Sequence, residues 1–87
     1  MFVSYNFSII DERDWRIPVG DRAFRYGDGL FETILYNNGQ IQHLTDHIRR
    51  LKRGMKALGF EGISGIMEEV VHYQILNVVR KNGIENQ

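Results

Sequence analysis

The sequence has 87 residues, with eleven basic and eleven acidic side chains, no net formal charge and no cysteine. The charge balance predicts no nucleic-acid or membrane-surface partner, and the lack of cysteine excludes a disulfide framework, a thiolate metal site and a cysteine nucleophile. A chain of this length suits one small domain, whose core buries only about 60 to 65% of the surface that the unfolded chain exposes. We therefore expect marginal stability.

Residues 1–10 alternate apolar and polar side chains and carry no basic leader, so they indicate a strand rather than a signal peptide. They predict two short strands that turn near Asn6, although Phe7 stands where a glycine would favour the turn. No apolar run approaches the roughly 20 residues that a membrane span requires. We expect a soluble, cytoplasmic protein.

The next segments are expected to be a loop over residues 11–16, extended chain before Pro18, and a single helical turn over residues 21–26. Two β-prone runs follow, at residues 30–36 and 40–44, with Asn37, Asn38 and Gly39 between them. Asn-Gly is a strong hairpin signal, because both central residues of a type I′ turn need positive φ. These two strands should pair antiparallel.

Two helices are predicted after the strands. Thr45 can cap the first, which should end at Gly59 and carries an apolar stripe made of Ile48, Leu51, Met55 and Leu58. The second should run from about Ser64 to Asn82 with Gly83 after it, and its apolar face is expected to hold Ile66, Val70, Tyr73 and Leu76. This order predicts an α+β domain with two layers, a small antiparallel sheet covered on one face by two helices.

The cations of the first helix have two possible roles. On a helical wheel, Arg49, Lys52, Arg53 and Lys56 spread over the outward side, whereas Arg50 follows a separate stripe with His47, Gly54 and Ala57. A solvated helix face is one interpretation. In the other, the small residues allow a close approach, and the Arg50 guanidinium binds a phosphate or carboxylate in bidentate fashion. Spacing alone leaves both open.

Other chemical motifs are weak. The segment Gly27-Asp28-Gly29 permits a tight bend but lacks the further glycine and the following helix of a dinucleotide fingerprint. His43, His47 and His72 show no metal-ligand spacing, so we predict no metal site. Glu32 is expected to be half-buried and to form an ion pair with a neighbouring arginine rather than act as a general acid or base.

The ordered set of motifs resembles a known family. Asp21-Arg22, then Tyr26-Gly27-Asp28-Gly29-Leu30-Phe31-Glu32-Thr33, the Asn-Gly hairpin, and Leu44, His47, Arg50 and Leu51 are similar to the start of class IV aminotransferases. That family of fold-type IV pyridoxal-phosphate enzymes includes branched-chain and D-amino acid aminotransferases and 4-amino-4-deoxychorismate lyase. The resemblance runs in register from Met1 to about Leu58.

The resemblance implies roles for three residues. The arginine that matches Arg50 binds the phosphate of pyridoxal phosphate. Phe31 matches an aromatic position that lines the substrate pocket, and Tyr26 matches one that reaches the pocket across the dimer interface. Both aromatic residues could equally be core residues.

The resemblance also implies that residues 1–87 are the N-terminal domain of the D-amino acid aminotransferase-like fold. The larger domain, which holds the Schiff-base lysine, would lie beyond the end of this chain. Lys52, Lys56 and Lys81 are poor substitutes, because an exposed amine stays protonated. No catalytic residue is therefore expected in this chain, and the chain by itself should be inactive.

Three functions follow from these observations. The first is amino-group transfer between an amino acid and a 2-oxo acid by a cytoplasmic homodimer that uses pyridoxal phosphate. The second is the lyase reaction of the same family, which converts aminodeoxychorismate to 4-aminobenzoate and pyruvate. The third is a small binding module whose basic helix grips phosphates, although no aromatic side chains interleave with the cations and the net charge is nil.

Overall fold

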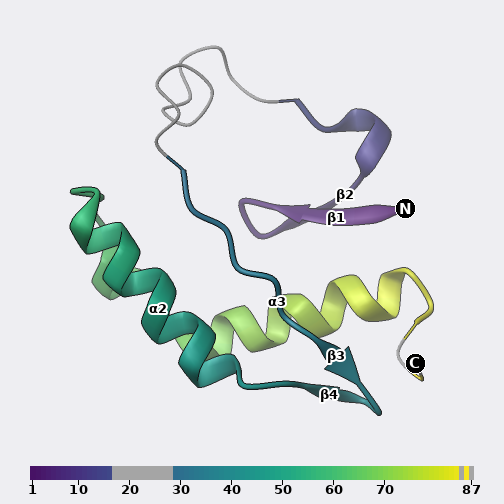
Figure 1. Ribbon diagram of the computed structural model, residues 1–87. Coiled ribbons are helices and arrows are strands. Elements are labelled where there is room, and N and C mark those ends of the chain that lie inside the picture. Colours follow the sequence, from purple (N-terminus) through teal and green to yellow (C-terminus); the bar gives the residue numbers. More distant parts are fainter. Residues whose placement is uncertain (17–28, 85, 87) are drawn as a thin grey trace.

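The computed structural model describes residues 1–16, 29–84 and 86, and the helical turn expected at residues 21–26 lies outside them. The chain opens with a hairpin of β1 (Phe2–Tyr5) and β2 (Ser8–Asp11), which pair antiparallel with Tyr5 opposite Ser8 (Figure 1). The turn is formed by Asn6 at φ 50° and Phe7 at φ 68°. The predicted turn near Asn6 is confirmed, and an aromatic residue holds the left-handed conformation that glycine would adopt more cheaply.

A short 3-10 helix, η1 (Glu12–Asp14), follows the first hairpin. The Asp11 side chain caps it, because one carboxylate oxygen accepts a hydrogen bond from the Arg13 backbone N–H at 2.9 Å. The Arg13 guanidinium also donates to both oxygens of Asp11 and holds the pKa of this carboxyl below its usual value. Trp15 then meets the ring of Tyr5 edge-on, with the ring centroids 6.1 Å apart.

The second hairpin is shorter than the sequence predicts. β3 (Tyr36–Asn37) pairs with β4 (Gln40–Ile41) around Asn38 at φ 52° and Gly39 at φ 76°, so the predicted Asn-Gly turn is confirmed. The strands expected at 30–36 and 40–44 are wrong in extent. His43 adopts a left-handed conformation and turns the chain into a helix at Leu44. Beyond β3 and β4 the hairpin continues only through the hydrogen bond from the Gln42 N–H to the Leu35 carbonyl, and residues 29–34 have no partner strand among the described residues.

Helix α2 (Leu44–Ala57) begins after His43, which makes no side-chain cap. The predicted cap by Thr45 is wrong, because Thr45 lies inside the helix and its hydroxyl contacts the Glu68 carboxylate instead. The predicted end is confirmed. Gly59 has φ 75° and donates to the Lys56 carbonyl, while the next N–H bonds the Met55 carbonyl, which together form a Schellman motif.

Helix α3 (Glu68–Lys81) starts four residues later than predicted, after the 3-10 helix η2 (Ile63–Gly65). It ends as predicted, with Gly83 at φ 69° after the C-cap Asn82. The predicted apolar face is wrong in part, because Val70 is 41% exposed and Tyr73 is 60% exposed. The face turned inward carries Val71, Ile75 and Val79.

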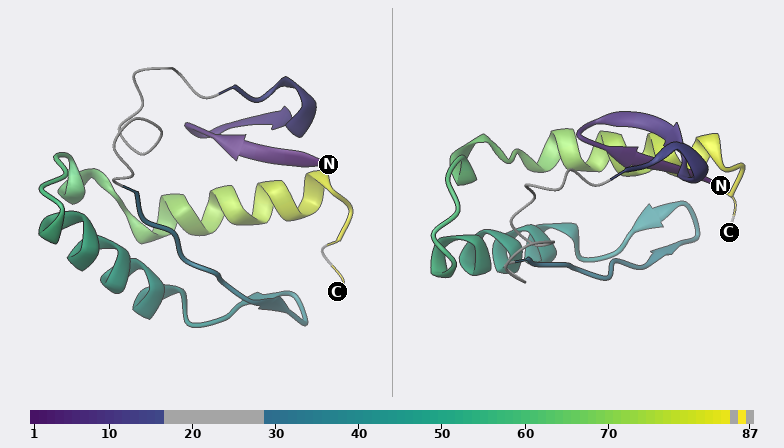
Figure 2. Two further views of the ribbon diagram at one scale, coloured as in Figure 1. Left: turned by 45° about the horizontal axis from the view of Figure 1, so that its top comes forward. Right: turned by 90° about the horizontal axis from the view of Figure 1, so that it is seen from above.

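The fold is α+β, as predicted, but its described strands form two separate two-stranded sheets rather than one. The two further views show α3 beside the β1–β2 hairpin, with α2 and the β3–β4 hairpin in a second layer (Figure 2). Neither described helix is long and apolar enough to cross a bilayer.

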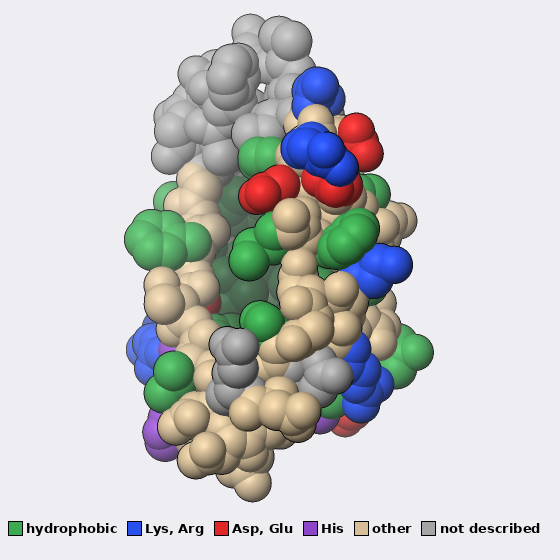
Figure 3. All heavy atoms as spheres, turned by 90° about the vertical axis from the view of Figure 1, so that its right-hand side faces the viewer, with side chains coloured by type: hydrophobic (Ala, Val, Ile, Leu, Met, Phe, Trp, Pro, Cys, Tyr) green, Lys and Arg blue, Asp and Glu red, His purple; other side chains and the backbone are tan. Residues whose placement is uncertain are grey.

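The core is small. Among the described residues, the buried hydrophobic side chains are Leu44, Ile48 and Val79. One face carries a hollow lined with hydrophobic side chains (Figure 3). A pocket of about 440 Å³ lies between the turn of the first hairpin and α3, where Phe7 faces Val71, Ile75 and Val78. Much apolar surface thus stays in contact with solvent.

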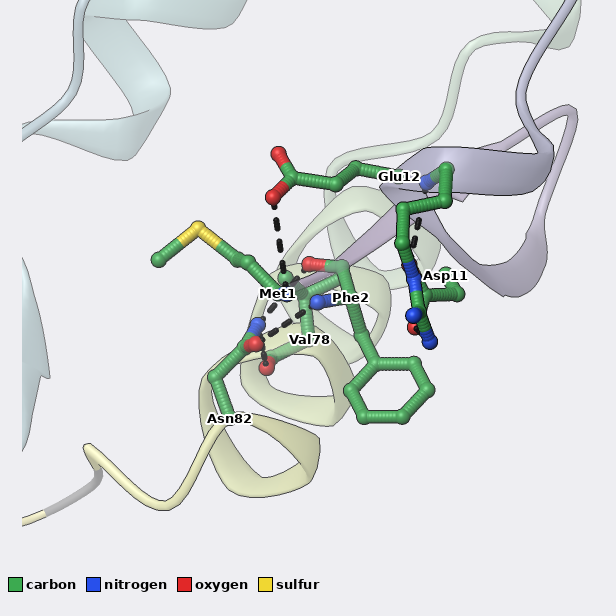
Figure 4. Close-up of polar contacts among 7 residues, drawn as sticks. Met1, Phe2, Asp11, Glu12, Val78 and Asn82 are labelled. Carbon is green, nitrogen blue, oxygen red and sulfur yellow. Dashed lines mark hydrogen bonds and ion pairs between the residues drawn. The ribbon is translucent and has the colours of Figure 1, made fainter.

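One side chain joins the two ends of the described chain. The Asn82 carboxamide accepts a hydrogen bond from the Phe2 N–H at 2.7 Å and donates to the Phe2 carbonyl at 2.8 Å and the Val78 carbonyl at 2.9 Å (Figure 4). The Lys81 ammonium lies 4.8 Å from the centre of the Phe2 ring. The C-terminal end of α3 is therefore tied to the start of β1.

Candidate anion-binding site

The extended segment before β3 presents its side chains alternately. Phe31, Thr33 and Leu35 are exposed, whereas Glu32 and Ile34 turn toward the helices, as the period of two in extended chain requires. The segment runs across the front of the molecule toward β3 (Figure 1). This placement brings Glu32 to α2.

Glu32 bridges two residues of α2 that are three positions apart. One carboxylate oxygen, Oε2, lies 3.0 Å from His47 Nδ1, and the other, Oε1, accepts a hydrogen bond from Arg50 Nε at 3.2 Å. Side chains three residues apart on a helix lie on the same face, which allows one carboxylate to reach both. The predicted ion pair between Glu32 and a neighbouring arginine is confirmed, and the arginine is Arg50.

The electrostatics of this cluster favour an ionised Glu32. The hydrogen bond from His47, followed by that from Arg50, holds the pKa of the Glu32 carboxyl below its usual value, and partial burial opposes the shift. The Glu32 side chain is 21% exposed and that of His47 is 13% exposed, whereas the Arg50 side chain is 53% exposed. The cluster thus has a covered carboxylate and imidazole and a guanidinium that reaches solvent.

The open part of the guanidinium is its terminal edge. Arg50 Nε is bound to Glu32, and Nη2 lies 3.0 Å from His47 Nδ1. Nη1 donates no hydrogen bond to a described residue. The Nη1–Nη2 edge of a guanidinium matches the spacing of two oxygens of a phosphate or carboxylate.

Gly54 allows close packing beside this cluster. A Cβ at this position would lie 3.1 Å from Leu30 Cδ2 and 3.2 Å from Leu30 Cδ1. The sequence predicted a close approach on the stripe of small residues, and the group that approaches is Leu30. The contact fixes the start of the segment that carries Phe31 and Glu32 against α2.

A pocket of about 260 Å³ adjoins the cluster, and its walls combine Glu32 and His47 with the apolar side chains of Phe31, Ile34 and Leu51. Phe31 therefore lies at the pocket, with its side chain 89% exposed. Arg50 does not line this pocket, but it contacts the lining residues Glu32 and His47. Tyr26, the other aromatic residue expected at a substrate site, lies outside the described residues.

The remaining cations of α2 differ from Arg50. Arg49 pairs with Asp46 at 3.4 Å, Arg53 and Lys56 are exposed, and Lys52 is half-buried rather than fully outward as expected. No group of histidine and acidic side chains with metal-binding geometry occurs within the described ranges. The sequence did not indicate that His47 would share the Glu32 carboxylate, because that contact joins separate elements.

The chain is similar to several curated enzymes. It is 33% identical to a putative branched-chain-amino-acid aminotransferase of Methanocaldococcus jannaschii over 86 residues, which are 99% of this chain and 29% of that protein. It is 43% identical to the aminodeoxychorismate lyase of Vibrio harveyi over 42 residues, which are 48% of this chain and 16% of the lyase.

A D-alanine aminotransferase of Bacillus licheniformis is 30% identical over 61 residues, which are 70% of this chain and 22% of that enzyme. The chain is a homologue of the class IV aminotransferases. It spans less than a third of the length of each of these three relatives. No family model matches the chain, and no solved structure does.

Proposed function

We propose that this chain supplies the phosphate-binding part of a class IV aminotransferase that transfers an amino group between an amino acid and a 2-oxo acid. The observation that carries the proposal is Arg50, whose Nε donates to Glu32 while its side chain stays half-exposed. In this proposal residues 1–87 correspond to the N-terminal domain, and the protein works in the cytoplasm as a homodimer.

Pyridoxal phosphate fits these residues in one specific way. Its phosphate monoester is a dianion at neutral pH, and the terminal nitrogens of a half-exposed guanidinium bind such a group through charge-assisted hydrogen bonds. The bound cofactor would supply an electron sink for the substrate carbanion. Arg50 fixes the phosphate end, and Phe31, at the adjoining pocket, limits which substrate side chains fit beside it.

We place the covalent attachment of the cofactor outside this chain. Lys56 and Lys81 are exposed, and the Lys81 ammonium lies over the Phe2 ring. Lys52 is half-buried on α2. Among these three lysines, none lies at the pocket beside Glu32 and His47.

The lyase reaction is a second candidate, favoured by the 43% identity to the Vibrio harveyi aminodeoxychorismate lyase over 42 residues. Both reactions would use the same phosphate contact. A binding module for nucleic-acid phosphates has less support, because Arg49 and Arg50 are each paired with a carboxylate and so offer less charge to a polyanion.

Calorimetric titration of the chain with pyridoxal phosphate, and with pyridoxal as the matched ligand without the phosphate, tests the proposal. The wild-type chain should prefer the phosphorylated ligand, and Arg50→Ala should remove that preference, since each charge-assisted bond contributes roughly 1.5 to 3 kcal/mol. The control Arg53→Ala should keep it. Equal losses in both variants would favour a diffuse basic patch, and the lack of any preference in the wild type would contradict the proposal.

A further inference from the structure

His47 Nδ1 has two close neighbours that make opposite demands on it. Glu32 Oε2 and Arg50 Nη2 each lie 3.0 Å from this nitrogen. An ionised carboxylate only accepts hydrogen bonds, and a guanidinium nitrogen only donates them. One ring nitrogen either carries a proton and donates, or lacks a proton and accepts, so it can bond only one of the two neighbours.

The carboxylate decides between these states. Glu32 is held in its ionised form by its partners, so a bare Nδ1 would place two lone pairs against each other at 3.0 Å. With a proton on Nδ1, His47 donates to Glu32, and the short contact with Arg50 Nη2 is not a hydrogen bond. This holds for both the neutral ring and the imidazolium, because both can carry the Nδ1 proton.

We propose that Glu32 and His47 are positioning residues that keep the terminal edge of Arg50 available to a phosphate monoester. Glu32 takes the Nε hydrogen bond and fixes the direction of the guanidinium. It also fixes the Nδ1–H form of His47, so that His47 accepts no hydrogen bond from Nη2. Nη1 and Nη2 are then left to bind two phosphate oxygens. This inference rests on the proposed phosphate-binding role of Arg50.

The contact of Glu32 with His47 distinguishes this cluster from a simple ion pair between Glu32 and Arg50. A carboxylate that bound both Nε and Nη2 of Arg50 would use one of the two N–H groups of Nη2. Here the second carboxylate oxygen is taken by His47, at a side-chain exposure of only 13%. His47 thereby keeps Glu32 from taking an N–H group of Nη2, so both N–H groups of this nitrogen are left for a phosphate.

Nitrogen-15 NMR of the histidine rings tests the inference on the chain itself, without cofactor. The chain has three histidines, and the variants His43→Asn and His72→Gln identify the signals of His47 by elimination. We expect the wild-type His47 ring to carry a proton on Nδ1 at neutral pH. A ring found mainly in the Nε2–H form with Nδ1 bare would overturn the inference, and this measurement needs no variant at Glu32.

Glu32→Gln supplies the second arm. The glutamine Oε1 can still accept from Arg50 Nε, but its amide nitrogen donates toward His47, so the ring should switch from mainly Nδ1–H to mainly Nε2–H. The control Glu61→Gln, at an exposed position just beyond the C-terminal end of α2, should leave the tautomer unchanged. A His47 tautomer that is the same in Glu32→Gln and wild type would show that Glu32 does not set it.

Addition of inorganic phosphate separates this inference from the proposed function. If both are correct, saturating phosphate shifts the Arg50 Nη signals while His47 stays Nδ1–H. If phosphate shifts no Arg50 signal, the phosphate-binding role of Arg50 fails. The positioning role proposed for Glu32 and His47 then fails as well, whichever tautomer His47 adopts. If phosphate shifts Arg50 but His47 loses the Nδ1 proton, Arg50 binds phosphate and the positioning role is overturned.

Discussion

Asn82 and Phe2 stand 80 positions apart in the sequence, yet the Asn82 carboxamide bonds both the N–H and the carbonyl of Phe2 (Figure 4). A backbone pair in a sheet exchanges hydrogen bonds in the same way, so Asn82 acts as a one-residue partner for the outer edge of β1. Its third bond goes to the Val78 carbonyl, which also accepts a hydrogen bond from the Asn82 backbone N–H at 3.1 Å.

Replacement of Asn82 should destabilise the chain. Asn82→Ala removes three hydrogen bonds that each contribute about 0.5 to 1.5 kcal/mol, so we expect a loss of roughly 1.5 to 4.5 kcal/mol in the free energy of unfolding. Urea unfolding measures it. The control Asn86→Ala, at an exposed position, should change the midpoint little. Equal stability of Asn82→Ala and wild type would show that α3 and β1 are not joined by this side chain.

Acid should destabilise the fold through Glu32. The unfolded carboxyl has its usual pKa, and the folded one has a lower pKa, so the unfolded state binds more protons and stability rises with pH. The contribution is complete above the usual pKa of glutamate and is lost as the pH falls through the lower folded value. Asp11, whose pKa Arg13 lowers, acts in the same direction.

Urea unfolding of wild type and Glu32→Gln between about pH 7 and about pH 3 checks this prediction. The variant should lose less stability on acidification than the wild type, since glutamine does not titrate. Glu61→Gln should follow the wild-type curve. An acid limb of the same steepness in Glu32→Gln would mean that Glu32 ionises alike in the folded and unfolded states.

Phe7 should tolerate glycine with a gain in stability. Its φ of 68° places a Cβ in the left-handed region at a cost of about 1 to 2 kcal/mol, and its side chain is 66% exposed. Phe7→Gly should raise the free energy of unfolding by about 1 kcal/mol after the larger unfolded-state entropy of glycine is included. Phe7→Ala keeps the Cβ and should show no gain. A loss of stability with glycine would mean that packing of the ring over α3 outweighs the turn.

The exposed apolar side chains should promote association. Phe31 is 89% exposed and Leu35 is 62% exposed, on the same side of the extended segment, and apolar surface of this kind tends to recruit a partner. Sedimentation of the chain over a concentration series should show self-association that Phe31→Ser with Leu35→Ser weakens. Thr33→Ser, between them, is the control. A monomer at every concentration would contradict the prediction.

The parts of the fold that the sequence predicted are those fixed by local backbone geometry. Gly59, Gly83 and the Asn38-Gly39 turn need positive φ, and each lies where it was expected. The helix starts were missed because neither His43 nor Met67 caps its helix with a side chain, so no local signal marks them. The prediction of a single sheet was also wrong, because the described strands form two separate hairpins. The strand predicted at residues 30–36 needs a partner strand of equal length, and α2 begins where that partner would continue.

The sequence predicted mainly those features of the candidate site that lie within one secondary-structure element. Helical periodicity separated Arg50 from the other cations, because that relation lies within one element. The contact of His47 with Glu32, and that of Leu30 with Gly54, join an extended segment to a helix, and periodicity carries no information about such contacts. In the sequence, only the small residue Gly54 on the stripe of Arg50 indicated that another group would pack closely against the helix.

The proposed function and the positioning role of Glu32 and His47 both require that Arg50 binds a phosphate group. The most direct measurement follows the NMR signals of the arginine side chains while the chain is titrated with inorganic phosphate. Arg50 should shift and saturate at phosphate concentrations that leave Arg53, on the outward face of the same helix, nearly unchanged. Shifts of equal size at both arginines, or no shift at Arg50, would contradict the assignment of Arg50 as the phosphate-binding residue.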